Sequence, residues 1–78
     1  MIIELTTEDE FQYFKWRNGY IIIQDPSRTF IHRSHCHDVK ISSFRENKSN
    51  YGSYFTTEDI DYGIRRFQAE RCSNCCTN

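Results

Sequence analysis

Cysteine and histidine gather in two short segments of this sequence, far apart along the chain. The segments are His32-Arg-Ser-His35-Cys36-His37 and Cys72-Ser-Asn-Cys75-Cys76. Thiolate sulfur and imidazole nitrogen are the preferred ligands of structural zinc sites, which bind the ion through four protein atoms. A Cys-x-x-Cys turn aims two sulfur atoms at one point, and the ion takes its other ligands from a distant segment. The pattern therefore predicts a zinc site that cross-links the two segments, so that metal binding contributes folding free energy.

The spacing favours one ligand set: His32, Cys36, Cys72 and Cys75. The first two are separated by three residues and form a workable chelate, whereas neighbours in an extended chain point in opposite directions. Cys75 is preferred over Cys76 because two intervening residues form the usual metal-binding turn. Three alternatives stay open, in which a predicted ligand is replaced by His35, His37 or Cys76.

The cysteines also allow two readings without a metal, namely isolated core residues or a disulfide framework. The chain opens on Met1-Ile-Ile-Glu-Leu and soon reaches Glu8-Asp9-Glu10, which is unlike a secretory signal. Its longest apolar run, 20–23, is far shorter than the ~20 residues of a membrane span. We therefore expect a cytoplasmic protein without membrane contact, where reducing conditions favour metal over disulfides.

The chain is short enough for its size to bear on its stability. Its 78 residues predict one domain over 1–78, and a domain of this size buries only about 60% of its unfolded surface. Aromatic residues make up 15% of the sequence and could build a compact core. We expect an N-terminal helix within 1–19 and a zinc-binding core over 20–76, with the metal supplying stability that so small a core lacks.

Local signals predict the first elements. Thr7 followed by Glu10 is a capping-box pattern that predicts a helix start, and Asn18-Gly19 predicts its end through a left-handed glycine. The β-branched run 20–24 and the segment 29–32 predict a hairpin around the turn 25–28. This hairpin would carry His32 to the end of a sheet.

The second half is less regular. We expect a short strand or irregular chain over 38–44, an exposed loop over 45–50 and a brief strand at 54–55. The sequence Thr56-Thr57-Glu58-Asp59 repeats the capping signature of the first helix, and Ile60, Ile64 and Phe67 then share one helical face, weakened by Gly63. Together these elements predict a small zinc-stabilised α+β domain with an antiparallel hairpin or short sheet and two helices.

Three motifs together resemble the Ada-type zinc-binding domain of DNA-repair proteins. They are Phe30-Ile31-His32-Arg33-Ser34-His35-Cys36, Tyr54-Phe55-Thr56 and Cys72-Ser-Asn-Cys75, spread over about 20–76. The resemblance implies the same four ligands, His32, Cys36, Cys72 and Cys75. In repair members the first ligand is a cysteine that accepts a methyl group from DNA, but here it is His32. An imidazole is not the thiolate that such transfer needs, so methyl transfer is not expected.

The net charge of −1 is unevenly spread, because acids dominate 1–14 and bases dominate 15–48. A global attraction to nucleic acid is thereby excluded, so binding would require a local basic patch. Our candidates for contact with DNA or RNA phosphates are Arg28, Arg33, Lys40, Arg45, Lys48, Arg65 and Arg66. Tyr51 and Tyr54 could stack on bases.

A protein partner is the alternative. The rings of Phe11, Tyr13, Phe14 and Trp16 outnumber what one helix face can bury, so some could form an exposed docking patch. Enzyme activity is not expected, since four ligands close the zinc coordination shell and no acid is placed as an evident general base.

Overall fold

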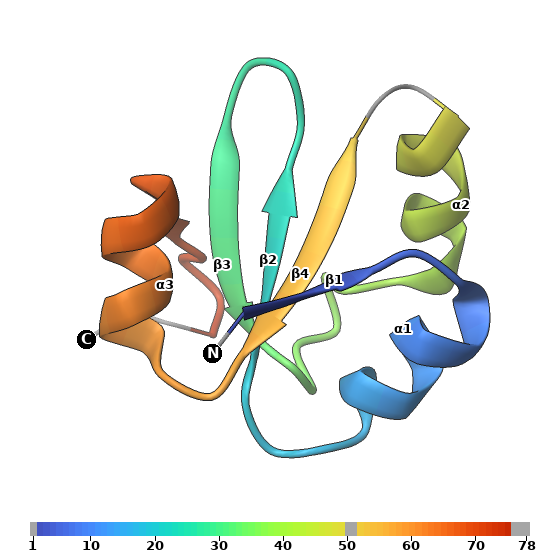
Figure 1. The fold of residues 1–78 in the computed structure, drawn as a ribbon, viewed down its shortest axis with the longest axis horizontal. Coiled ribbons are helices and arrows are strands. Elements are labelled where there is room, and N and C mark those ends of the chain that lie inside the picture. The colour runs from blue at the N-terminus through green and yellow to red at the C-terminus, as the bar shows by residue number, and fades with distance from the viewer. Residues whose placement is uncertain (1, 50–51, 76–78) are drawn as a thin grey trace.

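A five-stranded sheet runs through the middle of the molecule, with helices on both sides (Figure 1). The computed structural model describes residues 2–49 and 52–75. In chain order the elements are β1 (Ile2–Leu5), α1 (Glu8–Lys15), β2 (Tyr20–Gln24), β3 (Thr29–Arg33), α2 (Ile41–Ser49), β4 (Ser53–Thr57), α3 (Ile60–Phe67) and β5 (Glu70–Arg71). The strand order is β1-β4-β2-β3-β5, antiparallel except for the last pair. The predicted α+β class and the β2–β3 hairpin are confirmed.

Helix α1 begins as predicted but ends early. The Thr7 hydroxyl accepts a hydrogen bond from the Glu10 N–H at 3.1 Å, and the Glu10 carboxylate accepts from the Thr7 N–H in return. The predicted glycine cap is wrong, because the helix ends at Lys15 with Trp16 as its C-cap. Gly19, with a φ of +143°, instead lets the chain pass close to the Thr57 carbonyl, 3.1 Å from where a Cβ would stand.

Helix α2 corrects the prediction of two helices, because it lies where a strand and an exposed loop were expected over 38–44 and 45–50. Phe44 is fully buried in this helix, with its ring centroid 4.9 Å from Phe11 and 5.1 Å from Tyr54. This nine-residue helix contains only two large apolar residues, Ile41 and Phe44, so the sequence shows almost no helical periodicity. The helix is therefore decided by contacts with α1 and β4, which only the folded chain provides.

The two faces of the sheet carry separate cores. On one face, beneath α1 and α2, the buried residues include Leu5, Phe11, Ile21, Val39, Phe44 and Tyr54. On the other face, α3 packs onto Ile22 and Ile31 with Ile60, Ile64 and Phe67, which confirms their predicted common face. Neighbours such as Ile21 and Ile22 serve opposite cores because side chains alternate along a strand.

Close approach explains the glycine in α3. A Cβ at Gly63 would stand 3.0–3.1 Å from the Ile31, Ile22 and Thr57 side chains, so this helix lies tight against the sheet. Its N-cap is Asp59, the last residue of the predicted capping signature, which accepts from the Tyr62 N–H at 3.1 Å. The position of Thr7 in the first signature is here taken by Thr57, which still belongs to β4. Within the described residues, no helix is long and apolar enough to cross a membrane.

Candidate metal centre

The hairpin delivers the first two candidate ligands. His32 lies near the end of β3, opposite Ile21 of β2, and so points toward the α1/α2 face. The chain then turns back on itself, with the Cys36 N–H donating to the Arg33 carbonyl and the Val39 N–H donating to the Cys36 carbonyl, both at 3.0 Å. This turn brings Cys36 beside the imidazole.

The other two candidate ligands, Cys72 and Cys75, follow β5, a strand that the sequence did not predict. β5 pairs in parallel with β3, and the Cys72 N–H extends that ladder by donating to the Ile31 carbonyl at 3.0 Å. Cys72 therefore lies next to His32. The chain then turns so that Cys75 Sγ accepts from the Arg33 N–H at 3.2 Å, while Cys72 Sγ accepts from the Asn74 N–H at 3.4 Å.

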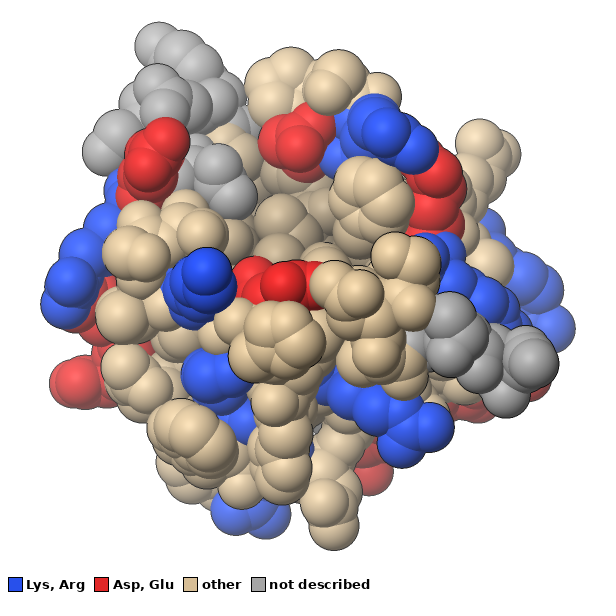
Figure 2. All heavy atoms as spheres, turned by 180° about the vertical axis from the view of Figure 1, so that it is seen from behind, with Lys and Arg blue, Asp and Glu red and all other residues tan. Residues whose placement is uncertain are grey.

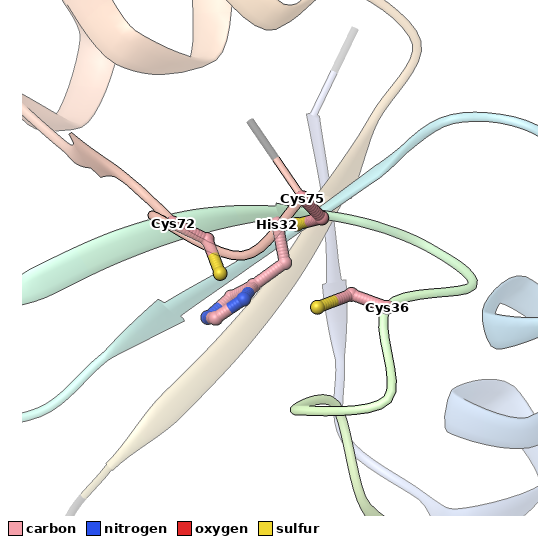
Figure 3. Close-up of side chains that lie close together, drawn as sticks. All are labelled: His32, Cys36, Cys72 and Cys75. Atoms are coloured by element: carbon pink, nitrogen blue, oxygen red, sulfur yellow. The ribbon is translucent and has the colours of Figure 1, made fainter. Parts of the chain in front are cut away.

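The four predicted ligands gather at one point. Their side chains converge from β3, the following turn and the C-terminal segment (Figure 3). The ligand atoms of His32, Cys36, Cys72 and Cys75 all lie within 4.8 Å of one another. A tetrahedral ion with bonds of about 2.0–2.3 Å needs ligand atoms somewhat closer, about 3.5–3.8 Å apart. A modest contraction would thus suit this cluster to a metal ion.

The chemistry of His32 fits a ligand. Its ring is buried, and its Nδ1 has no hydrogen-bond partner. An unpaired buried polar atom is costly, and a metal ion would supply the missing partner. Burial also lowers the pKa of His32, against a smaller opposing effect of Asp38, so the ring is held neutral with a lone pair available.

The Cys36 thiol is held neutral without a metal. Burial raises its pKa to about 12, and the neighbouring thiols of Cys75 and Cys72 add to the effect. A divalent cation would reverse this preference by stabilising the thiolate. Lys15 lies close by, its Nζ donating to the Cys36 carbonyl at 3.2 Å, and would partly balance the negative charge of three thiolates.

Two outer residues were missed by the sequence analysis. Asn74 Nδ2 donates to the Asp38 carboxylate at 2.6 Å, and this bond is the main cause of the lowered Asp38 pKa. The same carboxylate lies 3.6 Å from Cys72 Sγ. Their only sequence signal is position, since Asn74 lies inside Cys-x-x-Cys and Asp38 lies two residues after Cys36. Such outer contacts orient ligands and tune metal affinity.

The alternative histidine ligands do not join the cluster. His35 is exposed, with its ring centroid 6.1 Å from that of Trp16. His37 is also exposed and lies against Asp38, 3.5 Å from its carboxylate. Cys76 lies outside the described residues.

The candidate nucleic-acid contacts do not form one patch. They lie on the hairpin turn (Arg28), the end of β3 (Arg33), the chain before and within α2 (Lys40, Arg45, Lys48), and α3 (Arg65, Arg66). Two of them form ion pairs at 2.8 Å, Arg28 with Glu70 and Arg45 with Glu8. The side chain of Lys48 is outside the description. Figure 2 shows the same dispersion, with Lys and Arg in separate groups and acids between them.

Of the predictions for exposed aromatic residues, that for Tyr54 is wrong and that for the rings of α1 is confirmed. Tyr54 is fully buried against Phe11, so it cannot stack on a base as predicted, and Tyr51 lies outside the described residues. By contrast, Trp16 is 66% exposed and Tyr13 55% exposed at the end of α1, as the excess of rings in that helix predicted.

Comparison with protein-family models, curated proteins and solved structures found no match.

Proposed function

We propose that this chain is a structural zinc-binding domain, with His32, Cys36, Cys72 and Cys75 as a closed Cys3His ligand set. The observation that carries the proposal is the convergence of these four ligand atoms within 4.8 Å. Three thiolates and one imidazole suit zinc better than hard cations, which prefer oxygen. The resemblance to Ada-type domains leads to the same ligand set.

A scaffold role follows from the closed shell. Catalytic zinc sites keep one position for water or substrate, whereas four protein ligands leave none. His32 replaces the thiolate that would accept a methyl group, and it is buried. We therefore propose a domain that acts by binding and not by catalysis. A reducing compartment such as the cytoplasm would preserve its thiolates.

Metal analysis of purified variants tests the site. The wild type should contain about one zinc per chain, and the ion should be lost in Cys72→Ser and in His32→Ala. His35→Ala is the matched control, because that exposed histidine follows the same strand without joining the cluster. Full zinc content in His32→Ala, or none in the wild type, would refute this ligand set.

For the partner, we propose nucleic acid, bound at the end of α1 and not across the dispersed basic residues. This surface, here called the α1 end, consists of Tyr13, Lys15, Trp16 and Arg17. The Arg17 guanidinium carbon lies 4.8 Å from the Tyr13 ring centroid, and Lys15 Nζ lies 5.1 Å from that of Trp16. Exposed rings interleaved with cations are the usual platform for unpaired bases and their phosphates.

Trp16 makes the proposal measurable, because it is the sole tryptophan. Titration with a single-stranded oligonucleotide should quench its fluorescence, with an affinity that falls as salt rises. Tyr13→Ser should weaken binding by about tenfold, since one stacked base contributes about 1–3 kcal/mol. Tyr62→Ser is the matched control, an exposed ring on α3. Absence of quenching at low salt would reject nucleic acid.

A protein partner is the second candidate, favoured by the same exposed rings. Tyr and Trp are enriched where interfaces gain most of their affinity. Here the binding would depend on Trp16 but vary little with salt. Pull-down with the wild type and Trp16→Ser, and sedimentation for self-association, would distinguish this outcome.

A further inference from the structure

A pocket lies beside the α1 end, and none of the four candidate metal ligands lines it. It has a volume of about 460 Å³ and lies between the chain that leaves α1 and the turn that follows β3. The lining residues that bear on its chemistry are Arg17, Gly19, Arg33, Ser34, His35 and Glu58. None of these six belongs to the metal cluster.

The charged groups of the pocket favour an anion. Two arginines and one glutamate line it, so the formal charge of the lining is positive even with His35 neutral. Arg33 is held in place by its Nε, which donates to the Cys75 carbonyl at 2.9 Å, and this bond does not use its two terminal nitrogen atoms. Arg17 is held by its stacking on Tyr13. Guanidinium groups fixed in this way match the oxygens of a phosphate.

An unsatisfied hydroxyl marks the inner wall of the pocket. Ser34 is only 2% exposed, and its Oγ has no hydrogen-bond partner. Gly19 lies beside this oxygen, since a Cβ there would stand 3.8 Å from it, at van der Waals distance. Native folds rarely leave such a group unpaired. A small movement of this buried hydroxyl toward the pocket would let it donate a hydrogen bond to an anion oxygen.

We propose that this pocket binds a phosphate group, and that the group is a backbone phosphate of the nucleic acid whose bases stack on Tyr13 and Trp16. The second part rests on the proposed function. The position supports it, because the His35 ring lies next to Trp16 and the Arg17 guanidinium lies next to Tyr13. Phosphate contacts and stacked rings would thus be adjacent, as single-strand binding requires.

Zinc-loaded protein titrated with inorganic phosphate, and separately with an oligothymidylate, tests both parts by NMR. Both ligands should shift the Arg17 and Arg33 Nε–H signals, and only the oligonucleotide should also shift the Trp16 indole. Arg17→Gln should weaken both ligands by about tenfold, and Ser34→Ala by a few-fold. Arg66→Gln is the matched control, because that arginine also stacks on a ring, Phe67, but on α3.

The outcomes separate the two proposals. Oligonucleotide binding that Arg17→Gln and Ser34→Ala leave unchanged, with no response to phosphate, would overturn the pocket and keep nucleic-acid binding. Phosphate binding without oligonucleotide binding would support the pocket and overturn nucleic acid as the source of the phosphate. Retained zinc in each variant would show that a lost signal is not a lost fold.

Discussion

The two faces of the sheet bury their apolar side chains in different ways. The α3 face is closed by contact alone, with Gly63 bringing the helix down onto Ile22 and Ile31. On the α1/α2 face, the buried rings continue directly into Cys36 and Cys72, which belong to the same core. The candidate metal ligands thus take the place of apolar side chains at one end of that face. In so small a chain, coordination can complete a core that side-chain volume cannot.

Metal removal should give the largest effect and separate the faces most sharply. A chelator should unfold the α1/α2 face and release the C-terminal segment, because structural zinc supplies roughly 10–16 kcal/mol of apparent binding free energy in zinc-finger peptides. Circular dichroism and thermal melts with and without chelator would measure the loss. Re-addition of zinc is the control for damage. An unchanged melting temperature would mean that both faces hold by contact alone.

Phe44→Ala should have the next largest effect. The substitution removes the ring that packs between Phe11 and Tyr54, and we expect a loss of about 3–5 kcal/mol in zinc-saturated protein. Denaturant unfolding would measure it. Tyr62→Ala, an exposed ring, should stay within about 0.5 kcal/mol. Equal effects of the two variants would mean that Phe44 does not pack against these two rings.

This contrast also explains what could be predicted from sequence. The four candidate ligands lie in two compact motifs, so their local spacing predicted which four would gather. Helix α2 depends on contacts of Phe44 with Phe11 and Tyr54, which lie outside the helix, so no local sequence pattern predicts it. The two-residue strand β5 is likewise made by its pairing with β3. The sequence thus predicted the candidate ligands from local spacing and failed at α2 and β5, which tertiary contacts decide.

Gly63→Val tests the other face. Its Cβ would begin 3.0–3.1 Å from three side chains, so we expect overpacking to cost about 2–3 kcal/mol. Zinc content should stay at the wild-type value, because the crowded contacts lie on the α3 face. Denaturant unfolding together with metal analysis would measure both. Loss of zinc in this variant would contradict the separation of the faces.

A pH change from 7.5 to 6.5 should act mainly on the candidate metal site. Because burial keeps the Cys36 thiol pKa at about 12, zinc must displace its proton, and affinity should rise with pH below that value. This proton alone contributes up to tenfold per pH unit, or about 1.4 kcal/mol. Competition with a chelator at pH 7.5 and 6.5 would measure it, corrected for the chelator's own protons. The buried residues of the α3 face, Ile22, Ile31 and Ala69, carry no titrating side chain. Affinity that does not vary with pH would contradict the assignment of Cys36.

The smallest effects should come from a matched pair of helix caps, one on each face. Thr7 and Asp59 each accept a hydrogen bond of 3.1 Å from a first-turn N–H, so Thr7→Ala and Asp59→Ala should each cost about 1 kcal/mol. If the domain unfolds as one unit, the two variants should lower protection from hydrogen exchange equally across the sheet. If the α1/α2 face unfolds independently of the α3 face, Asp59→Ala should accelerate hydrogen exchange in α3 only. The amides of Arg33 and Cys72 should then stay protected while zinc is bound. Separate exchange would mean that the two faces differ in dynamics as well as in packing. Equal exchange would mean that they differ in packing only.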